Sequence, residues 1–143
     1  MSRWHLLFLS VLYFGCGKDQ VPSTQVDLRL KPQGSGDFVL FENVNGIWDS
    51  NAKHAEINAS GYNFELFHLN LGNLEDTGFV ANLSTDKIYY FDGLEFYPSS
   101  ITNGFIHISR LTPAKIEADF LINFISRSNN SNTITGTFEI SNK

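Results

Sequence analysis

The residue with the clearest chemistry in this sequence is Cys16, the only cysteine among 143 residues. It follows Gly15 and an apolar run at residues 4–14, which has Arg3 in front of it. An apolar run of about 11 residues is typical of a signal-peptide core, whereas a helix that crosses a membrane needs about 20. A lipoprotein peptidase cuts before such a cysteine, and the lipid is joined to the thiol. We therefore expect residues 1–15 to be a lipoprotein signal peptide and Cys16 to be the lipidation site.

The alternative is an ordinary signal peptide followed by a free cysteine. Tyr13 favours this alternative, because lipoprotein signals usually have Leu or Val three residues before the cysteine. The small residue Gly15 and the lack of any other cysteine favour lipidation. Because no second cysteine is present, no disulfide can form within the chain, and its core must hold it together.

The residues after Cys16 predict a tether and a destination. Residues 16–36 are rich in Gly, Ser, Pro and Gln, which is linker composition, and within them residues 26–30 alternate as a weak edge strand would. Cys16-Gly17-Lys18-Asp19 resembles the opening of surface lipoproteins in Bacteroidota. That resemblance implies that Lys18 and Asp19 direct export to the outer face of the outer membrane; retention facing the periplasm is the alternative.

The charge of the chain argues against several partners. Its formal net charge is −5, and the basic residues form no run. Nucleic acids and anionic lipids need a basic patch, so both are poor partners for this chain.

No residue pattern predicts catalysis, a metal or a cofactor. His54, His68 and His107 are widely spaced and form no pair of the kind that zinc sites use. The carboxylates have neither the spacing of an acid/base pair nor that of a calcium loop, and no serine lies in a nucleophile elbow. We expect a protein that is not an enzyme and holds no cofactor or metal.

Residues 37–143 follow the pattern of an all-β domain. Hydrophobicity alternates with period 2, and turn residues recur every 8 to 12 positions. We expect an antiparallel β-sandwich, or a flattened barrel, of about 8–9 strands. Residues 115–126 and 133–140 show the clearest strands, and Gly136 on the inner face of the second predicts a bulge or a close crossing. The inner residues expected are Ile116, Ala118, Phe120, Ile122, Phe124, Ile134, Phe138 and Ile140.

Residues 62–71 break this alternation. Phe64 and Leu66 share one face, but Phe67, Leu69 and Leu71 share the other. A bulge near Leu66, or burial of both faces, would explain the change of phase.

Aromatic side chains offer the one suggestive surface. Residues 88–97 predict a hairpin around Asp92-Gly93, with Tyr89 and Phe91 on one face and Tyr90 and Tyr97 on the other. We expect the candidate binding surface to contain Trp48, Tyr90 and Tyr97, because exposed rings stack on sugars or grip a protein. The alternative is that these rings fill the core.

Three short motifs resemble small Bacteroidota lipoproteins built on a β-rich domain of unknown function. They are Asn45-Gly46-Ile47-Trp48, residues 104–108 (GFIHI) and Thr135-Gly136-Thr137-Phe138. Ala118-Asp119-Phe120 departs from the Gly-Thr-Phe that such proteins more often have. The resemblance implies a β-sandwich on a lipid anchor, and no known activity.

These observations favour a membrane-anchored, cell-surface module that binds a protein or a glycan without catalysis. Two alternatives remain: a lipid-anchored inhibitor or immunity protein, and a structural accessory subunit of an envelope complex.

Overall fold

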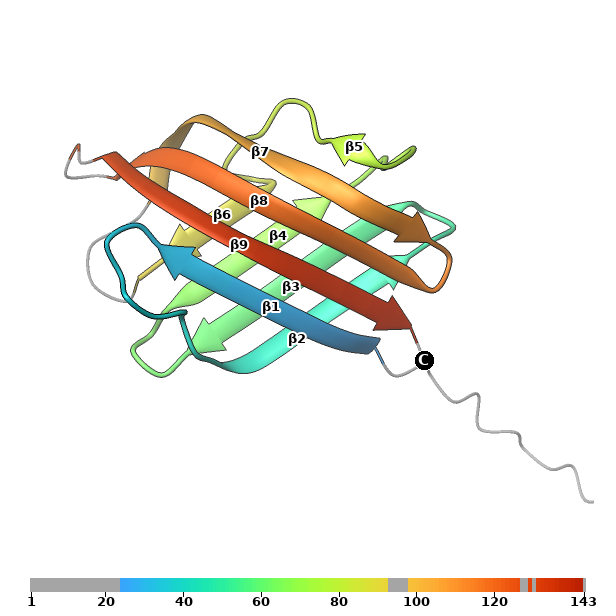
Figure 1. Cartoon of the computed structure of the whole chain (residues 1–143), viewed down its shortest axis with the longest axis horizontal. Coiled ribbons are helices and arrows are strands. Elements are labelled where there is room, and N and C mark those ends of the chain that lie inside the picture. The colour runs from blue at the N-terminus through green and yellow to red at the C-terminus, as the bar shows by residue number, and fades with distance from the viewer. Residues whose placement is uncertain (1–23, 93–97, 127–128, 130, 143) are drawn as a thin grey trace, which may run out of the picture.

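A computed structural model describes residues 24–92, 98–126, 129 and 131–142, which form two antiparallel sheets packed face to face (Figure 1). The strands in chain order are β1 (Thr24–Pro32), β2 (Phe41–Asp49), β3 (His54–Gly61), β4 (Leu66–Leu71), β5 (Gly78–Phe79), β6 (Ile88–Phe91), β7 (Pro98–Thr112), β8 (Lys115–Ser126) and β9 (Ser131–Asn142). The predicted β-sandwich is confirmed. Within the described ranges there is no helix long and apolar enough to span a membrane.

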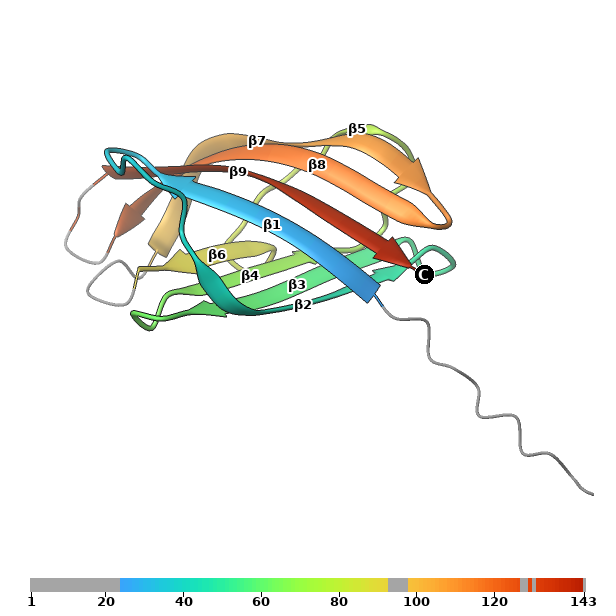
Figure 2. The same cartoon turned by 60° about the horizontal axis from the view of Figure 1, so that its bottom comes forward.

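The five-stranded sheet has the order β1-β9-β8-β7-β5, and the four-stranded sheet has the order β2-β3-β4-β6. Figure 2 shows them as two layers, which β1 and β2 join along one side. The chain crosses between the layers in the β1–β2 connection, residues 33–40, and again after β4, after β5 and after β6.

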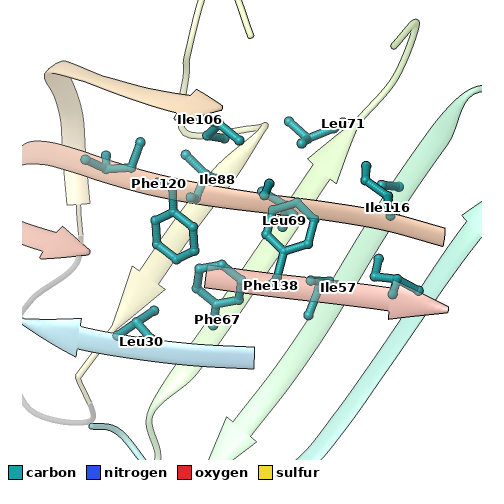
Figure 3. Packing of buried hydrophobic residues seen from close by; sticks show 14 of the residues in the cluster. Leu30, Ile57, Phe67, Leu69, Leu71, Ile88, Ile106, Ile116, Phe120 and Phe138 are labelled. Atoms are coloured by element: carbon teal, nitrogen blue, oxygen red, sulfur yellow. The ribbon is translucent and has the colours of Figure 1, made fainter. Parts of the chain in front are cut away.

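The core lies between the layers because inward positions alternate with outward ones along each strand. Phe67 of β4 stacks on Phe120 of β8 with ring centroids 5.7 Å apart, so the two sheets interdigitate at their centre (Figure 3). The inner residues predicted for 115–126 and 133–140 are all buried. The sequence-based assignment of these two faces is confirmed.

Gly136 marks a close crossing, as one of its two interpretations predicted. A Cβ at this position would overlap the Arg29 carbonyl oxygen and the ring of Phe120. The register of β9 with both neighbours is continuous through Gly136, so no bulge is present there.

The expected tether is wrong for residues 24–32. These residues form β1, which pairs with β9 along its whole length, from Thr24 opposite Asn142 to Pro32 opposite Ile134. Leu30 is fully buried in the core. The folded domain therefore includes residues from Thr24 onward rather than from 37, and β1 is the edge strand that the alternation of residues 26–30 indicated. Residues 1–23 lie outside the described part of the chain.

The register defines two ends of the sandwich. At the basal end, β1 begins beside the last residues of β9. At the opposite, apical end lie the β1–β2 connection and the β3–β4 turn, residues 62–65, which Figures 1 and 2 both show on the side away from the start of β1.

Candidate binding surface

The predicted binding surface is wrong at both positions that the structure describes. Trp48 and Tyr90 are each only 4 % exposed and belong to the core. Tyr97 lies outside the described residues, as do Cys16, Lys18, Asp19 and the turn residue Gly93. The alternation within residues 88–91 is confirmed, but the face containing Tyr90 points inward.

Physical contacts explain both burials. The indole Nε1 of Trp48 donates a hydrogen bond of 2.7 Å to the Thr112 carbonyl oxygen, and the Trp48 carbonyl accepts one of 2.9 Å from Asn142 Nδ2. Trp48 thereby joins the two sheets at the basal end. Tyr90 lies opposite the core residue Phe67.

Burial, and then the negative charges of Asp92 and Glu65, raise the pKa of the Tyr90 phenol well above its usual range. Tyr90 is therefore a neutral core residue.

Seven large hydrophobic side chains are exposed in the described part of the chain, and four of them belong to the apical end. Phe38 and Leu40 are in the β1–β2 connection, and Tyr62 and Phe64 are in the β3–β4 turn. We refer to these four residues as the apical surface. Exposed apolar side chains that gather in one place, rather than singly, mark interaction sites.

The β1–β2 connection is held by local hydrogen bonds that leave its apolar side chains outside. The Val39 amide donates to the Leu30 carbonyl at 2.8 Å, which fixes the connection against the end of β1. The Asp37 amide donates to Ser35 Oγ at 3.2 Å. The Lys31 ammonium nitrogen lies over the ring of Phe38, 5.9 Å from the ring centroid. Phe38 and Leu40 flank Val39, which is partly buried against the core.

The β3–β4 turn is closed by Glu65. The Gly61 amide donates to the Glu65 carbonyl at 2.9 Å, and the Asn63 amide donates to Glu65 Oε2 at 2.7 Å. This turn accounts for the break in alternation, because β4 begins only at Leu66 and Phe64 belongs to the turn. The expected bulge near Leu66 is absent from the pairing of β3 with β4.

Phe64 has a backbone conformation that its residue type does not favour. Its φ is 66°, and its side chain is 78 % exposed. Three of the other four described non-glycine residues with positive φ are asparagines, which tolerate this region, whereas a bulky aromatic residue there is strained. Neither the backbone nor the core explains a phenylalanine at this position.

A hollow of about 360 Å³ lies between the two apical segments and brings Phe38, Leu40 and Tyr62 together. Asp37 and Glu65 also line it. The Leu40 carbonyl oxygen would lie only 3.0 Å from a Cβ at Gly61, so the two segments are in close contact. The result is a concavity of mixed character, in which exposed apolar side chains lie beside acidic and other polar groups.

The residues that the structure describes form no catalytic constellation. His107 Nδ1 lies 3.0 Å from Asp119 Oδ1, and His54 Nε2 lies 3.7 Å from Glu56 Oε2. Both pairs are on outer faces of the sheets, and neither has a third partner of the kind that a nucleophile or a metal requires. No group of three His, Cys, Asp or Glu side chains that could hold a metal occurs in the described residues.

No protein-family model, curated protein or solved structure matches this chain.

Sequence reasoning missed the apical surface for a physical reason. Its residues come from two connections more than 20 positions apart, and period-2 alternation describes strands rather than connections. One signal was present: Phe64 breaks the alternation of residues 62–71.

Proposed function

We propose that this protein is a lipid-anchored, non-catalytic module of the outer membrane, facing the cell exterior, which binds a partner protein through its apical surface. The anchor is Cys16, and Lys18 and Asp19 give the direction of export. The observation that carries the binding role is Phe64, a strained and exposed aromatic residue at the same end of the sandwich as three other exposed apolar side chains. Strain of this kind persists in proteins where it serves a function.

The chemistry of the apical surface favours a protein over a glycan. Two phenylalanines, a leucine and a tyrosine supply apolar area and a single hydroxyl group. Sugars need many directional hydrogen bonds, whereas protein interfaces bury aromatic and aliphatic anchors in concave pockets. The hollow between the two apical segments has the form of such a pocket.

The position of the surface suits a partner that approaches from outside the membrane. The described chain begins at Thr24, at the basal end, and the apical surface lies at the far end of β1. A lipid on Cys16 would hold the basal end near the bilayer, so the apical surface would face away from it.

Photo-crosslinking in living cells tests this proposal. A photoreactive phenylalanine analogue placed at Tyr62 in the full chain should give one discrete adduct with a partner protein. The adduct should disappear when Phe38→Ala and Leu40→Ala are added. The matched control places the analogue at Thr137, which is exposed on the outer face of the five-stranded sheet, and should give no adduct. Equal labelling from both positions would refute the apical site.

A further inference from the structure

The outer face of the four-stranded sheet carries a row of polar side chains that runs across all four strands. Asn45 of β2 lies opposite Asn58 of β3, Asn58 lies opposite His68 of β4, and His68 lies opposite Tyr89 of β6. These residues are outward in the alternation, because the residues before and after each of them face the core. The four strands form one layer whose outer side faces away from the other sheet (Figure 2).

Two hollows meet on this row. One, of about 300 Å³, extends from Asn45 and Asn58 to His68, Tyr89 and Leu66. The other, of about 340 Å³, extends from the same two asparagines to Ile47 and Glu56. Because Asn45 and Asn58 line both, the hollows form one elongated trough. Leu66 and Ile47, both exposed, stand at its two ends.

Hydrogen bonds fix the polar groups along the trough. Asn58 Nδ2 donates to Glu56 Oε1 at 2.7 Å, and Asn58 Oδ1 lies 2.7 Å from His68 Nδ1. Since the Asn58 oxygen can only accept, His68 carries a proton on Nδ1, and in the neutral ring Nε2 is left as an acceptor. The trough therefore presents amide and imidazole groups that are held in place before a ligand arrives.

The trough is also poor in positive charge. Strands β2, β3, β4 and β6 contain no Lys or Arg. The five-stranded sheet differs: on its outer face, Lys115 lies 2.5 Å from Glu117 and 3.0 Å from Glu139, and Arg29 lies 3.6 Å from Asp27. One outer face thus carries Lys and Arg side chains paired with carboxylates, whereas the strands of the other carry asparagines and neither Lys nor Arg. Four of these asparagines, Asn43, Asn45, Asn58 and Asn70, are exposed there.

We propose that this trough, which we call the amide trough, is a binding site for an uncharged oligosaccharide. Sugar hydroxyl groups donate and accept hydrogen bonds, as carboxamides do, so the three asparagines that line the trough, Asn43, Asn45 and Asn58, match them. Leu66, Ile47 and Tyr89 supply apolar surface for the C–H faces of the rings. Phosphate, sulfate and carboxylate groups would find no cation on these strands, and Glu56 would repel them.

This site is independent of the apical surface and differs from it in chemistry. The apical surface is apolar and suits a protein, whereas the amide trough is polar and elongated and suits a chain of sugar units. A protein with both sites could hold a partner protein beside a glycan.

The test uses the full chain, purified in a detergent without a sugar headgroup so that the detergent does not compete. An array of uncharged and acidic oligosaccharides selects a probe, and titration calorimetry then measures the dissociation constant of the tightest uncharged hexasaccharide. Each neutral hydrogen bond lost weakens binding by about two- to tenfold, so Asn45→Ala and Asn58→Ala together should weaken it at least tenfold. Asn45→Ala alone keeps the test valid if Asn58→Ala disturbs the sheet.

Two controls separate this site from others. Thr137→Ala on the opposite outer face and Tyr62→Ala on the apical surface should both leave oligosaccharide binding unchanged. The proposal fails if no uncharged oligosaccharide binds at millimolar concentration, if acidic ones bind more tightly, or if binding survives the Asn45 and Asn58 substitutions. It also fails if those substitutions abolish self-association or peptide binding instead, which would assign the face to a polypeptide.

Discussion

Replacing Phe64 with Asn should stabilise the fold while weakening the binding of a partner at the apical surface. Phe64 has φ of 66° in the β3–β4 turn, and Asn tolerates this region because its short polar side chain bonds to the local backbone. A substitution that raises stability but lowers binding separates a functional residue from a structural one.

The magnitude follows from strain and burial. A left-handed conformation costs an ordinary L-residue about 1–2 kcal/mol. The Phe64 side chain is 78 % exposed, so only about a fifth of the roughly 1.5–3 kcal/mol that full burial contributes is lost on its removal. The free energy of unfolding should therefore rise by about 1 kcal/mol. For a domain of this size that corresponds to an increase in Tm of about 4 °C.

Urea unfolding followed by tryptophan fluorescence, with a thermal melt beside it, measures this change. Tyr62→Asn is the matched control, because Tyr62 lies in the same turn, is 72 % exposed and is not among the residues with positive φ. It should leave the free energy of unfolding within about 0.5 kcal/mol of the wild type. If F64N unfolds at the same or a lower urea concentration than Y62N, the strain argument is wrong.

Three further expectations concern the fold. Gly136→Ala should lower the free energy of unfolding in the urea assay by about 1–3 kcal/mol, because the new methyl group would overlap backbone and ring atoms that have no room to move. Gly72→Ala is the control: no atom lies nearer than 3.8 Å to the added Cβ, so the free energy of unfolding should stay within about 0.5 kcal/mol of the wild type. A chain of residues 37–143 should fail to give the cooperative thermal melt that residues 24–143 give, since it lacks β1 and exposes the edge of β9. Because the native pKa of Tyr90 is raised above its unfolded value of 10.0, its contribution to stability is present below pH 10 and is lost as the pH rises beyond it. The Tyr90→Phe variant should therefore lose less stability than the wild type between pH 9 and 11, as measured by unfolding followed with circular dichroism.

The strands were predictable where one face is consistently apolar. In β8, apolar residues at every second position, most of them Ile or Phe, specify both the strand and its inner face, and turn residues mark its start. Alternation alone does not say which of two aromatic faces is inward. Tyr90 and Tyr89 are equivalent in the sequence, and only the pairing of β6 with β4, which places Tyr90 opposite Phe67, decides between them.

The candidate sites were less predictable, because neither belongs to one segment. The apical surface forms where two connections meet, and the amide trough forms where four strands align in register. Asn45, Asn58 and His68 are unremarkable as single polar residues of exposed strands. They line up as one site only because of the strand register, which is set by the buried residues between them.

The position of β1 also constrains how the proposed anchor can act. Eight peptide steps separate Cys16 from Thr24, and they can span at most about 28 Å, whereas a tether that continued to residue 37 would span about 70 Å. β1 itself adds about 30 Å between the basal and apical ends. A lipid on Cys16 would thus keep the basal end close to the bilayer and hold the apical surface beyond it. A partner that binds the apical surface would then come from the medium, or would belong to a cell component that extends equally far from the bilayer. The outer sheet faces, including the amide trough, would run between the two ends, within reach of a glycan that covers the same membrane.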